Sequence, residues 1–134
     1  RRLVMDEIGE YMSSPVLSID TESSVQEAAQ YMTANHISSL LVKGYSGFVG
    51  IVTDTDLTRR VLGRGLDSET TKISEIMTQP ILSIDRFLPM DQASETMRAN
   101  KIRHLAVSEN DKIVGVLSVK DLVAYYTQSL RVEE

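Results

Sequence analysis

The stretch GIVTDTDL at residues 50–57 returns 65 residues later as GVLSVKDL at residues 115–122. Both stretches read glycine, two apolar residues, a hydroxyl residue, two variable residues, aspartate and leucine. Upstream, the sequence LSID at residues 17–20 returns at residues 82–85, at the same offset. Because the register holds without a gap between these landmarks, we interpret the chain as two copies of one structural unit.

Each copy has the pattern of a small α/β unit. Short apolar strands are predicted at residues 16–19 and 81–84, and each is entered through a proline. Apolar runs on either side of short polar turns predict hairpins over residues 39–53 and 104–118. With a helix before and after each hairpin, the order in each copy is β-α-β-β-α.

The helix before each hairpin has apolar residues at helical spacing. They recur at i, i+3, i+4 and i+7 over Val25–Met32, and the second copy has Met90, Ala93 and Met97 at i, i+3 and i+7. We expect the first of these helices to open with a capping box over Ser23–Gln26. In the second, Pro89 is expected in the first turn, where proline is favoured.

The helix after each hairpin is predicted to begin near Asp54 or Val119. It ends at Gly63 in the first copy and runs past Tyr126 toward Leu130 in the second. A short helix over residues 3–11 precedes the first copy. We divide the chain into an N-terminal helix or linker (1–9), a first domain (10–63), a linker (64–74) and a second domain with a C-terminal helix (75–134).

One unit of about fifty residues buries too little apolar surface to be stable alone. Two copies packed sheet to sheet would provide a shared core, and pseudo-twofold symmetry is the natural arrangement for two similar units. We therefore predict a mixed α/β (α+β) fold of two β-α-β-β-α repeats packed with pseudo-twofold symmetry.

The composition is that of a soluble globular protein, with 42% hydrophobic and 25% charged residues. A net charge of −5 argues against nucleic acid as a partner, and apolar runs of only a few residues argue against a membrane span. The absence of cysteine excludes thiolate catalysis, and the two histidines do not have metal-ligand spacing. Because no signal-peptide pattern opens the chain, we expect a cytoplasmic protein; the missing initiator Met suggests a fragment of a larger one.

The hydroxyl residue and the aspartate of the repeated motif allow two interpretations. Thr53 with Asp56, and Ser118 with Asp121, have the spacing of a helix N-cap that satisfies free backbone amides. The same helix start also offers N–H groups to a phosphate, and an ionised carboxylate accepts the two O–H groups of a ribose diol. Spacing alone leaves both interpretations open.

Taken together, the two copies, the Met-[Ser/Thr]-x-Pro entry to each first strand and the motif after each hairpin resemble a pair of CBS domains, a Bateman module. The resemblance extends from about Glu10 to Tyr126. It implies a regulatory module that binds an adenosine-containing ligand, such as AMP, ADP, ATP or NAD, in clefts between the copies. The bound state would be transmitted to an effector protein or a fused domain. The resemblance also implies a homodimer, and we expect no catalytic residue, required cofactor or metal.

The resemblance assigns roles to matched positions of the two copies. Asp56 and Asp121 would hold the ribose hydroxyls, and Thr53 and Ser118 the phosphate. Ser13 and Thr78, ahead of the first strands, would line the same clefts. The adenine would contact Val16 and Ile81, together with the backbone near Ile37, Ser38, Ile102 and Arg103. Arg103, His104 and Lys120 would also reach the phosphates.

Charge differs between the copies. Arg103, His104 and Lys120 of the second copy correspond to the uncharged residues 38, 39 and 55 of the first. We hypothesise that the copies are inequivalent and that one cleft binds a polyphosphate or dinucleotide more tightly. The alternative is that these three side chains are ordinary solvated surface residues.

The sequence also bears on functions other than ligand sensing. The chain has no phosphate-binding loop, zinc-protease or nucleophile-elbow motif, so we predict no enzymatic activity. The alternative function is a non-catalytic dimerisation or interaction module that binds no nucleotide. Arg59, Arg60 and Arg64 predict a solvated face or a partner contact. The stretch Leu122–Tyr126, with Leu130, is expected to form a contact surface or to pack within the monomer.

Overall fold

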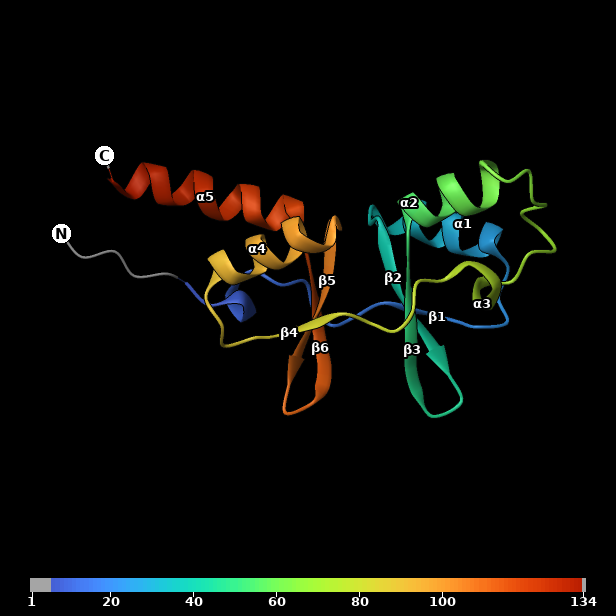
Figure 1. Ribbon diagram of the computed structural model, residues 1–134, viewed down its shortest axis with the longest axis horizontal. Helices are drawn as coiled ribbons and strands as arrows, with labels where there is room; N and C mark the ends of the chain where they lie inside the picture. Colours follow the sequence, from blue (N-terminus) through green and yellow to red (C-terminus); the bar gives the residue numbers. More distant parts are fainter. Residues whose placement is uncertain (1–5, 134) are drawn as a thin grey trace. The chain divides into compact units, whose positions relative to one another are not determined.

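The computed structural model describes residues 6–133, and the side chains of residues 6–128. The chain divides into two compact units whose boundaries differ from those of the sequence repeats. Residues 17–81 form the first-sheet unit. The residues up to Val16 join those from Leu82 onward in the second-sheet unit. Each unit contains one three-stranded sheet, whose strands are labelled in Figure 1.

In the first-sheet unit the middle strand pairs with one parallel and one antiparallel neighbour, in the order β1-β2-β3. Two helical segments follow the hairpin: a short α-helix continues directly into a π-helix. The elements are β1 (Ser18–Asp20), α1 (Val25–Asn35), β2 (Ser39–Gly44), β3 (Gly47–Thr53), α2 (Asp54–Asp56), the π-helix η2 (Leu57–Leu62) and α3 (Ile73–Ile76).

The second-sheet unit repeats this arrangement with the order β4-β5-β6. One regular α-helix replaces the α2–η2 pair after the hairpin. The elements are the 3-10 turn η1 (Ile8–Glu10), β4 (Ser83–Asp85), α4 (Met90–Asn100), β5 (His104–Glu109), β6 (Lys112–Ser118) and α5 (Val119–Glu133). No helix within residues 6–133 is long and apolar enough to cross a membrane.

The predicted β-α-β-β-α order and mixed α/β fold are confirmed in both copies. The first strands begin later than expected, at Ser18 and Ser83 instead of residues 16 and 81. The reason is that the chain changes unit at these points: Val16 belongs to the second-sheet unit and Ile81 to the first-sheet unit. Strand pairing starts only once the chain has reached its own sheet.

Two predicted helix starts are corrected. The capping box of α1 is formed by Ser24 and Glu27, one residue later than the predicted Ser23–Gln26 pair. Ser24 Oγ accepts from Glu27 N at 3.1 Å, and Glu27 Oε1 accepts from Ser24 N at 3.1 Å. The backbone N–H of Ser23 instead donates to Asp20 in the preceding turn, at 3.1 Å. Pro89 is the N-cap of α4 and not a residue of its first turn.

The helix ends mostly follow the prediction. Gly63 ends η2, with a right-handed φ of −63°, and α5 continues past Tyr126 and through residue 130. The expected N-terminal helix over residues 3–11 is a single 3-10 turn at Ile8–Glu10, and residues 3–5 lie outside the described residues.

Each unit has its own apolar core beneath its sheet and helices. The first-sheet core consists of Val25, Ala28, Met32, Leu40, Val42, Val52, Val61, Ile73 and Ile76. The second-sheet core consists of Ile8, Ile84, Met90, Ala93, Met97, Leu105, Val107, Leu117, Leu122 and Tyr125. The cores therefore draw on α3 in one unit and on the residues around η1 in the other, which lie outside the β-α-β-β-α pattern.

In the apolar stretch of α5, some residues pack within the unit and others remain exposed as a possible contact surface. Leu122 and Tyr125 are buried in the second-sheet core, with 9% and 3% of their surface exposed. Val123 and Tyr126 keep 59% and 38% exposed. The side chain of Leu130 lies outside the described residues.

Candidate functional site

The segment ahead of each first strand lies against the hairpin of the other copy. Ser13 and Val116 of β6 exchange backbone hydrogen bonds of 2.9 and 3.1 Å within the second-sheet unit. In the first-sheet unit, Thr78 and Ile51 of β3 exchange bonds of 2.8 and 3.0 Å. We call residues 12–16 and 77–81 the exchanged segments. They bring Ser13 into the unit of Asp121, and Thr78 into the unit of Asp56.

The glycine of the repeated motif makes this approach possible. A Cβ atom on Gly50 would lie 2.9 Å from the carbonyl oxygen of Thr78, and one on Gly115 would lie 3.0 Å from that of Ser13. Both separations are shorter than real Cβ contacts, or at their lower limit. The motif glycine therefore serves backbone packing, a role independent of any ligand.

In the first-sheet unit the hydroxyl residue and aspartate of the motif meet at the start of α2. Asp56 is buried, with 6% of its surface exposed. Its Oδ2 accepts hydrogen bonds from the backbone N–H of Thr53 at 2.9 Å and from the Thr53 hydroxyl at 3.3 Å. Its Oδ1 accepts from the hydroxyl of Thr78 at 3.0 Å. The predicted trio of Thr53, Asp56 and Thr78 is thus brought together.

Arg60 completes this cluster, although the sequence had suggested a solvated face or a partner contact for it. Its Nε lies 3.6 Å from Oδ1 of Asp56. Its Nη1 donates to the carbonyl oxygens of Ile76 and Met77, both at 3.1 Å. The guanidinium therefore binds the end of α3 and the buried carboxylate at once. Arg59 and Arg64, in contrast, are exposed as expected.

The matching site in the second-sheet unit is more open. Oδ2 of Asp121 accepts from the backbone N–H of Ser118 at 2.8 Å and from its hydroxyl at 3.3 Å. Within the described part of the chain, Oδ1 of Asp121 accepts no hydrogen bond. Ser13, the counterpart of Thr78, is exposed. The unit therefore combines a half-engaged carboxylate with an exposed hydroxyl.

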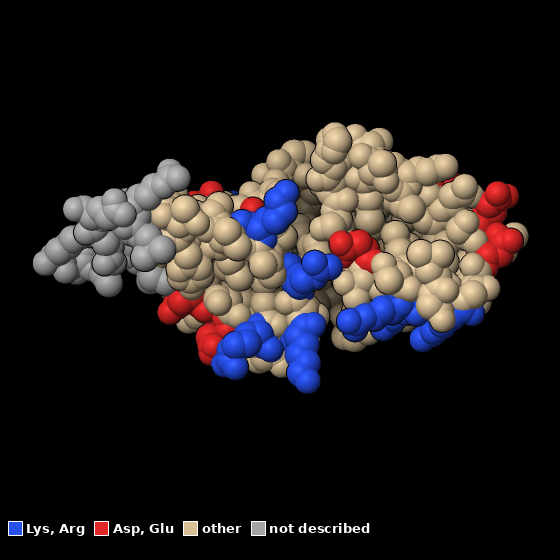
Figure 2. All heavy atoms as spheres, turned by 90° about the horizontal axis from the view of Figure 1, so that it is seen from above, with Lys and Arg blue, Asp and Glu red and all other residues tan. Residues whose placement is uncertain are grey.

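The basic residues predicted for this site are on the surface of the same unit. Arg103 and Lys120 are exposed, and His104 is partly buried as the first residue of β5. Lys120 lies in the first turn of α5, next to Asp121. Figure 2 shows exposed Lys and Arg side chains on both units. Of the remaining predicted residues of this unit, Val16 is partly buried and Ile102 packs against the core.

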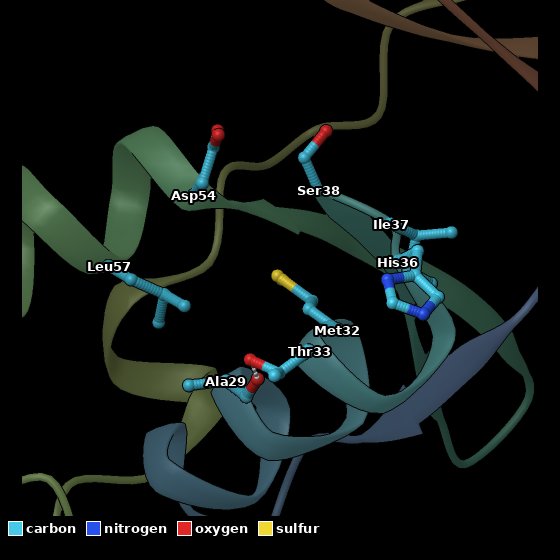
Figure 3. Close-up of a pocket in the computed structure, with 8 residues that line it drawn as sticks. All are labelled: Ala29, Met32, Thr33, His36, Ile37, Ser38, Asp54 and Leu57. Atoms are coloured by element: carbon cyan, nitrogen blue, oxygen red, sulfur yellow. Dashed lines mark hydrogen bonds between the residues drawn. The ribbon is translucent and has the colours of Figure 1, made fainter.

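A pocket of about 420 Å³ opens in the first-sheet unit between α1 and the start of α2. Figure 3 shows the predicted residues Ile37 and Ser38 at its rim, across from Asp54 and Leu57. Its floor is apolar, and its complete lining is Ala29, Met32, Thr33, His36, Ile37, Ser38, Asp54 and Leu57. Thr53, Asp56 and Thr78 are not among its lining residues, and Ile81 is partly buried elsewhere in the unit.

Sequence reasoning missed Arg60, Asp54 and Thr33 as members of these two sites. Asp54 lies inside the repeated motif and could have been noticed there. Thr33 and Arg60 carry no local signal, because a threonine or arginine at helical spacing on an amphipathic helix is ordinary. Their positions follow from which helix faces which segment in space.

Comparison with known proteins identifies the family of the chain. The family model of the CBS domain matches residues 8–63 and again residues 73–128. The chain belongs to the CBS domain family and carries two such domains, as the sequence predicted. It is similar to the CBS domain-containing protein YhcV of Bacillus subtilis, at 26% identity over 88% of this chain and 84% of that protein. CBSCBSPB2 of Arabidopsis thaliana is 34% identical over 79% of this chain, which spans only 20% of that longer protein.

Solved structures share the fold. A conserved protein from Pyrococcus horikoshii is 31% identical, with a TM-score of 0.83 over 88% of this chain and 89% of that one. The CBS domain pair of protein MJ0100 has a TM-score of 0.84 at 22% identity, over 94% of this chain and 99% of that one. That protein was solved in complex with 5′-methylthioadenosine and S-adenosyl-L-methionine.

Proposed function

We propose that this CBS pair is a regulatory module that binds an adenosine-containing ligand and passes its bound state to an effector protein or a fused domain. The observation that carries the proposal is the half-engaged carboxylate of Asp121 at the start of α5, beside Ser118. The adenosine-containing ligands of the fold neighbour MJ0100 support the same ligand class. In this proposal the module performs no catalytic step.

The chemistry of the second-sheet site suits such a ligand. An ionised carboxylate only accepts hydrogen bonds, so the available oxygen of Asp121 is matched to a ribose diol, which offers O–H donors. The start of α5 favours negative charge through its free N–H groups and dipole. Arg103 and Lys120 would supply positive charge for a phosphate chain, with His104 as a further polar contact, which favours ADP, ATP or NAD over an uncharged adenosine derivative.

Thermal unfolding with a ligand panel tests the proposal. We expect at least one of AMP, ADP, ATP, NAD and S-adenosyl-L-methionine to raise the unfolding midpoint. At 100 times its dissociation constant a ligand adds about 2.7 kcal/mol of stability. The 2′,3′-dideoxy form of the best nucleotide is the matched control, and it should shift the midpoint much less. If no member of the panel shifts the midpoint, the proposal is wrong.

An interaction module is the second candidate, and α5 favours it. Val123 and Tyr126 present apolar surface, with 59% and 38% exposed, and exposed apolar patches often mark protein contacts. A homodimer and an effector protein are the partners we propose, in the cytoplasm. Light scattering after gel filtration should then give twice the mass of the chain, and the double variant V123S/Y126S should give the monomer mass.

A further inference from the structure

We infer that the two aspartates of the repeated motif have different roles. Asp56 holds the fold of the first-sheet unit together, whereas Asp121 alone receives the ligand, so one chain binds one adenosine-containing molecule. The identity of the ligand rests on the proposed function. The difference between the two sites rests on the contacts of Asp56 and Arg60.

The carboxylate of Asp56 is already occupied. Three donors reach it at hydrogen-bond distance: the N–H and hydroxyl of Thr53 and the hydroxyl of Thr78. Because a carboxylate has about four acceptor positions, little capacity remains for a ribose. With 6% of Asp56 exposed, a ligand would have to displace an existing donor in order to approach.

Arg60 makes displacement of those donors unfavourable. Its Nη1 is held by the carbonyl oxygens of Ile76 and Met77, which fixes the guanidinium while its Nε faces Asp56. Thr78 follows Met77 directly, so Arg60 and Asp56 together fasten the exchanged segment to the first-sheet unit. A ligand that opened this cluster would leave the buried carboxylate of Asp56 without its cation and without the hydroxyl of Thr78, which is unfavourable.

The second copy lacks both fastening groups. The position that matches Arg60 is Tyr125, which is 3% exposed and packs edge-on against Tyr11 with ring centroids 5.2 Å apart. The position that matches Thr78 is the exposed Ser13. Within the described residues, the hydrogen bonds that Asp121 accepts come from Ser118 and from neither of these two side chains. Its Oδ1 therefore remains available.

The positively charged side chains near the motif also differ between the two copies. Lys120 is exposed beside Asp121, where the first copy has Thr55. In the first copy the cation nearest the motif is Arg60, and it points back into the protein. Lys120 thus adds positive charge beside Asp121 in the second copy, whereas Arg60 of the first copy binds Asp56 and the end of α3.

A comparison of two matched variants tests the structural half of the inference. Asp56→Asn and Asp121→Asn each keep an oxygen for the motif N–H, but only the first removes a buried carboxylate that is paired with an arginine. We expect Asp56→Asn to lower the unfolding midpoint by about 5 °C or more, and Asp121→Asn to change it little. Arg60→Met should behave like Asp56→Asn, and Arg59→Met, at an exposed neighbouring position, should not. Equal midpoints for the two asparagine variants would overturn the structural role of Asp56.

Calorimetric titration with AMP, ADP, ATP, NAD and S-adenosyl-L-methionine tests the ligand half. We expect one site per chain in the wild type and in Arg60→Met. In Asp121→Asn the affinity should fall about 10- to 100-fold, the equivalent of one charge-assisted hydrogen bond. Two equal sites, or unchanged affinity in Asp121→Asn, would overturn the assignment of the ligand to Asp121. If the wild type binds no member of the panel, the proposed function fails, whereas the unfolding comparison still decides the role of Asp56.

Discussion

The motif glycines show how one residue can matter for a reason unrelated to ligand binding. Gly50 lies where the exchanged segment crosses β3, and its missing side chain leaves room for the carbonyl of Thr78. The clash that a Cβ would create involves backbone, which cannot rotate away as a flexible side chain can. Glycine at this position therefore belongs to the fold of the unit.

Replacement of Gly50 by alanine should consequently destabilise the protein. Because the added Cβ would lie 2.9 Å from the Thr78 carbonyl oxygen, the exchanged segment must shift. Overpacking of this kind costs about 1–3 kcal/mol. Urea unfolding measures the loss, with Ser46→Ala in the exposed turn of the same hairpin as the control. A Gly50→Ala variant as stable as the control would show that the segment can move freely.

At the scale of elements, α5 is tied to the N-terminal part of its unit through Tyr11. The Tyr11 hydroxyl donates to Oδ2 of Asp6 at 2.9 Å and lies 3.0 Å from Oε1 of Gln128 on α5. Burial, with help from the hydrogen bond to Asp6 and its negative charge, raises the pKa of Tyr11 to about 12. The folded protein therefore favours the protonated phenol.

This shift predicts a loss of stability in alkaline solution. A folded-state pKa above the ordinary value of 10.0 means that the contribution of Tyr11 is fully present below that value and is lost as the pH rises through the folded pKa. The free energy of unfolding of the wild type should therefore fall more steeply than that of Tyr11→Phe between about pH 10 and about pH 12. Urea unfolding across this range measures both slopes, and parallel slopes would contradict the assignment.

The elements also show what the sequence could predict. Apolar spacing placed α1, α4 and both hairpins correctly, because their periodicity is local and strong. The spacing of the repeated motif also predicted that Thr53 contacts Asp56 and that Ser118 contacts Asp121. A residue at a helix N-cap and the residue three positions later are always close in space. The contacts of Arg60 could not be predicted, because its partners, the carbonyls at the end of α3, are distant in sequence and leave no periodic pattern.

At the scale of the whole molecule, the repeats and the compact units divide the chain differently. The predicted domain boundary at residue 63 separates β1–η2 from α3, which contributes Ile73 and Ile76 to the first-sheet core with 0% and 1% exposed. It also removes Thr78, which pairs with β3 and binds Asp56. Sequence similarity between the copies does not reveal this, because each exchanged segment resembles its counterpart wherever it lies.

A fragment that follows the boundaries of a compact unit should therefore be more stable than one that follows the boundaries of a sequence repeat. A fragment of residues 17–81 keeps α3, the exchanged segment and the Arg60–Asp56 contact, and we expect it to be more structured than residues 10–63. The fragment of residues 10–63 lacks Ile73 and Ile76, which belong to the same core as Val25 and Val61. A chain of this size is only marginally stable, so the loss of these two side chains should be large enough to unfold it. Far-ultraviolet circular dichroism with thermal unfolding compares the two. A cooperative transition at the same temperature in both fragments would show that α3 and the exchanged segment add nothing to the unit.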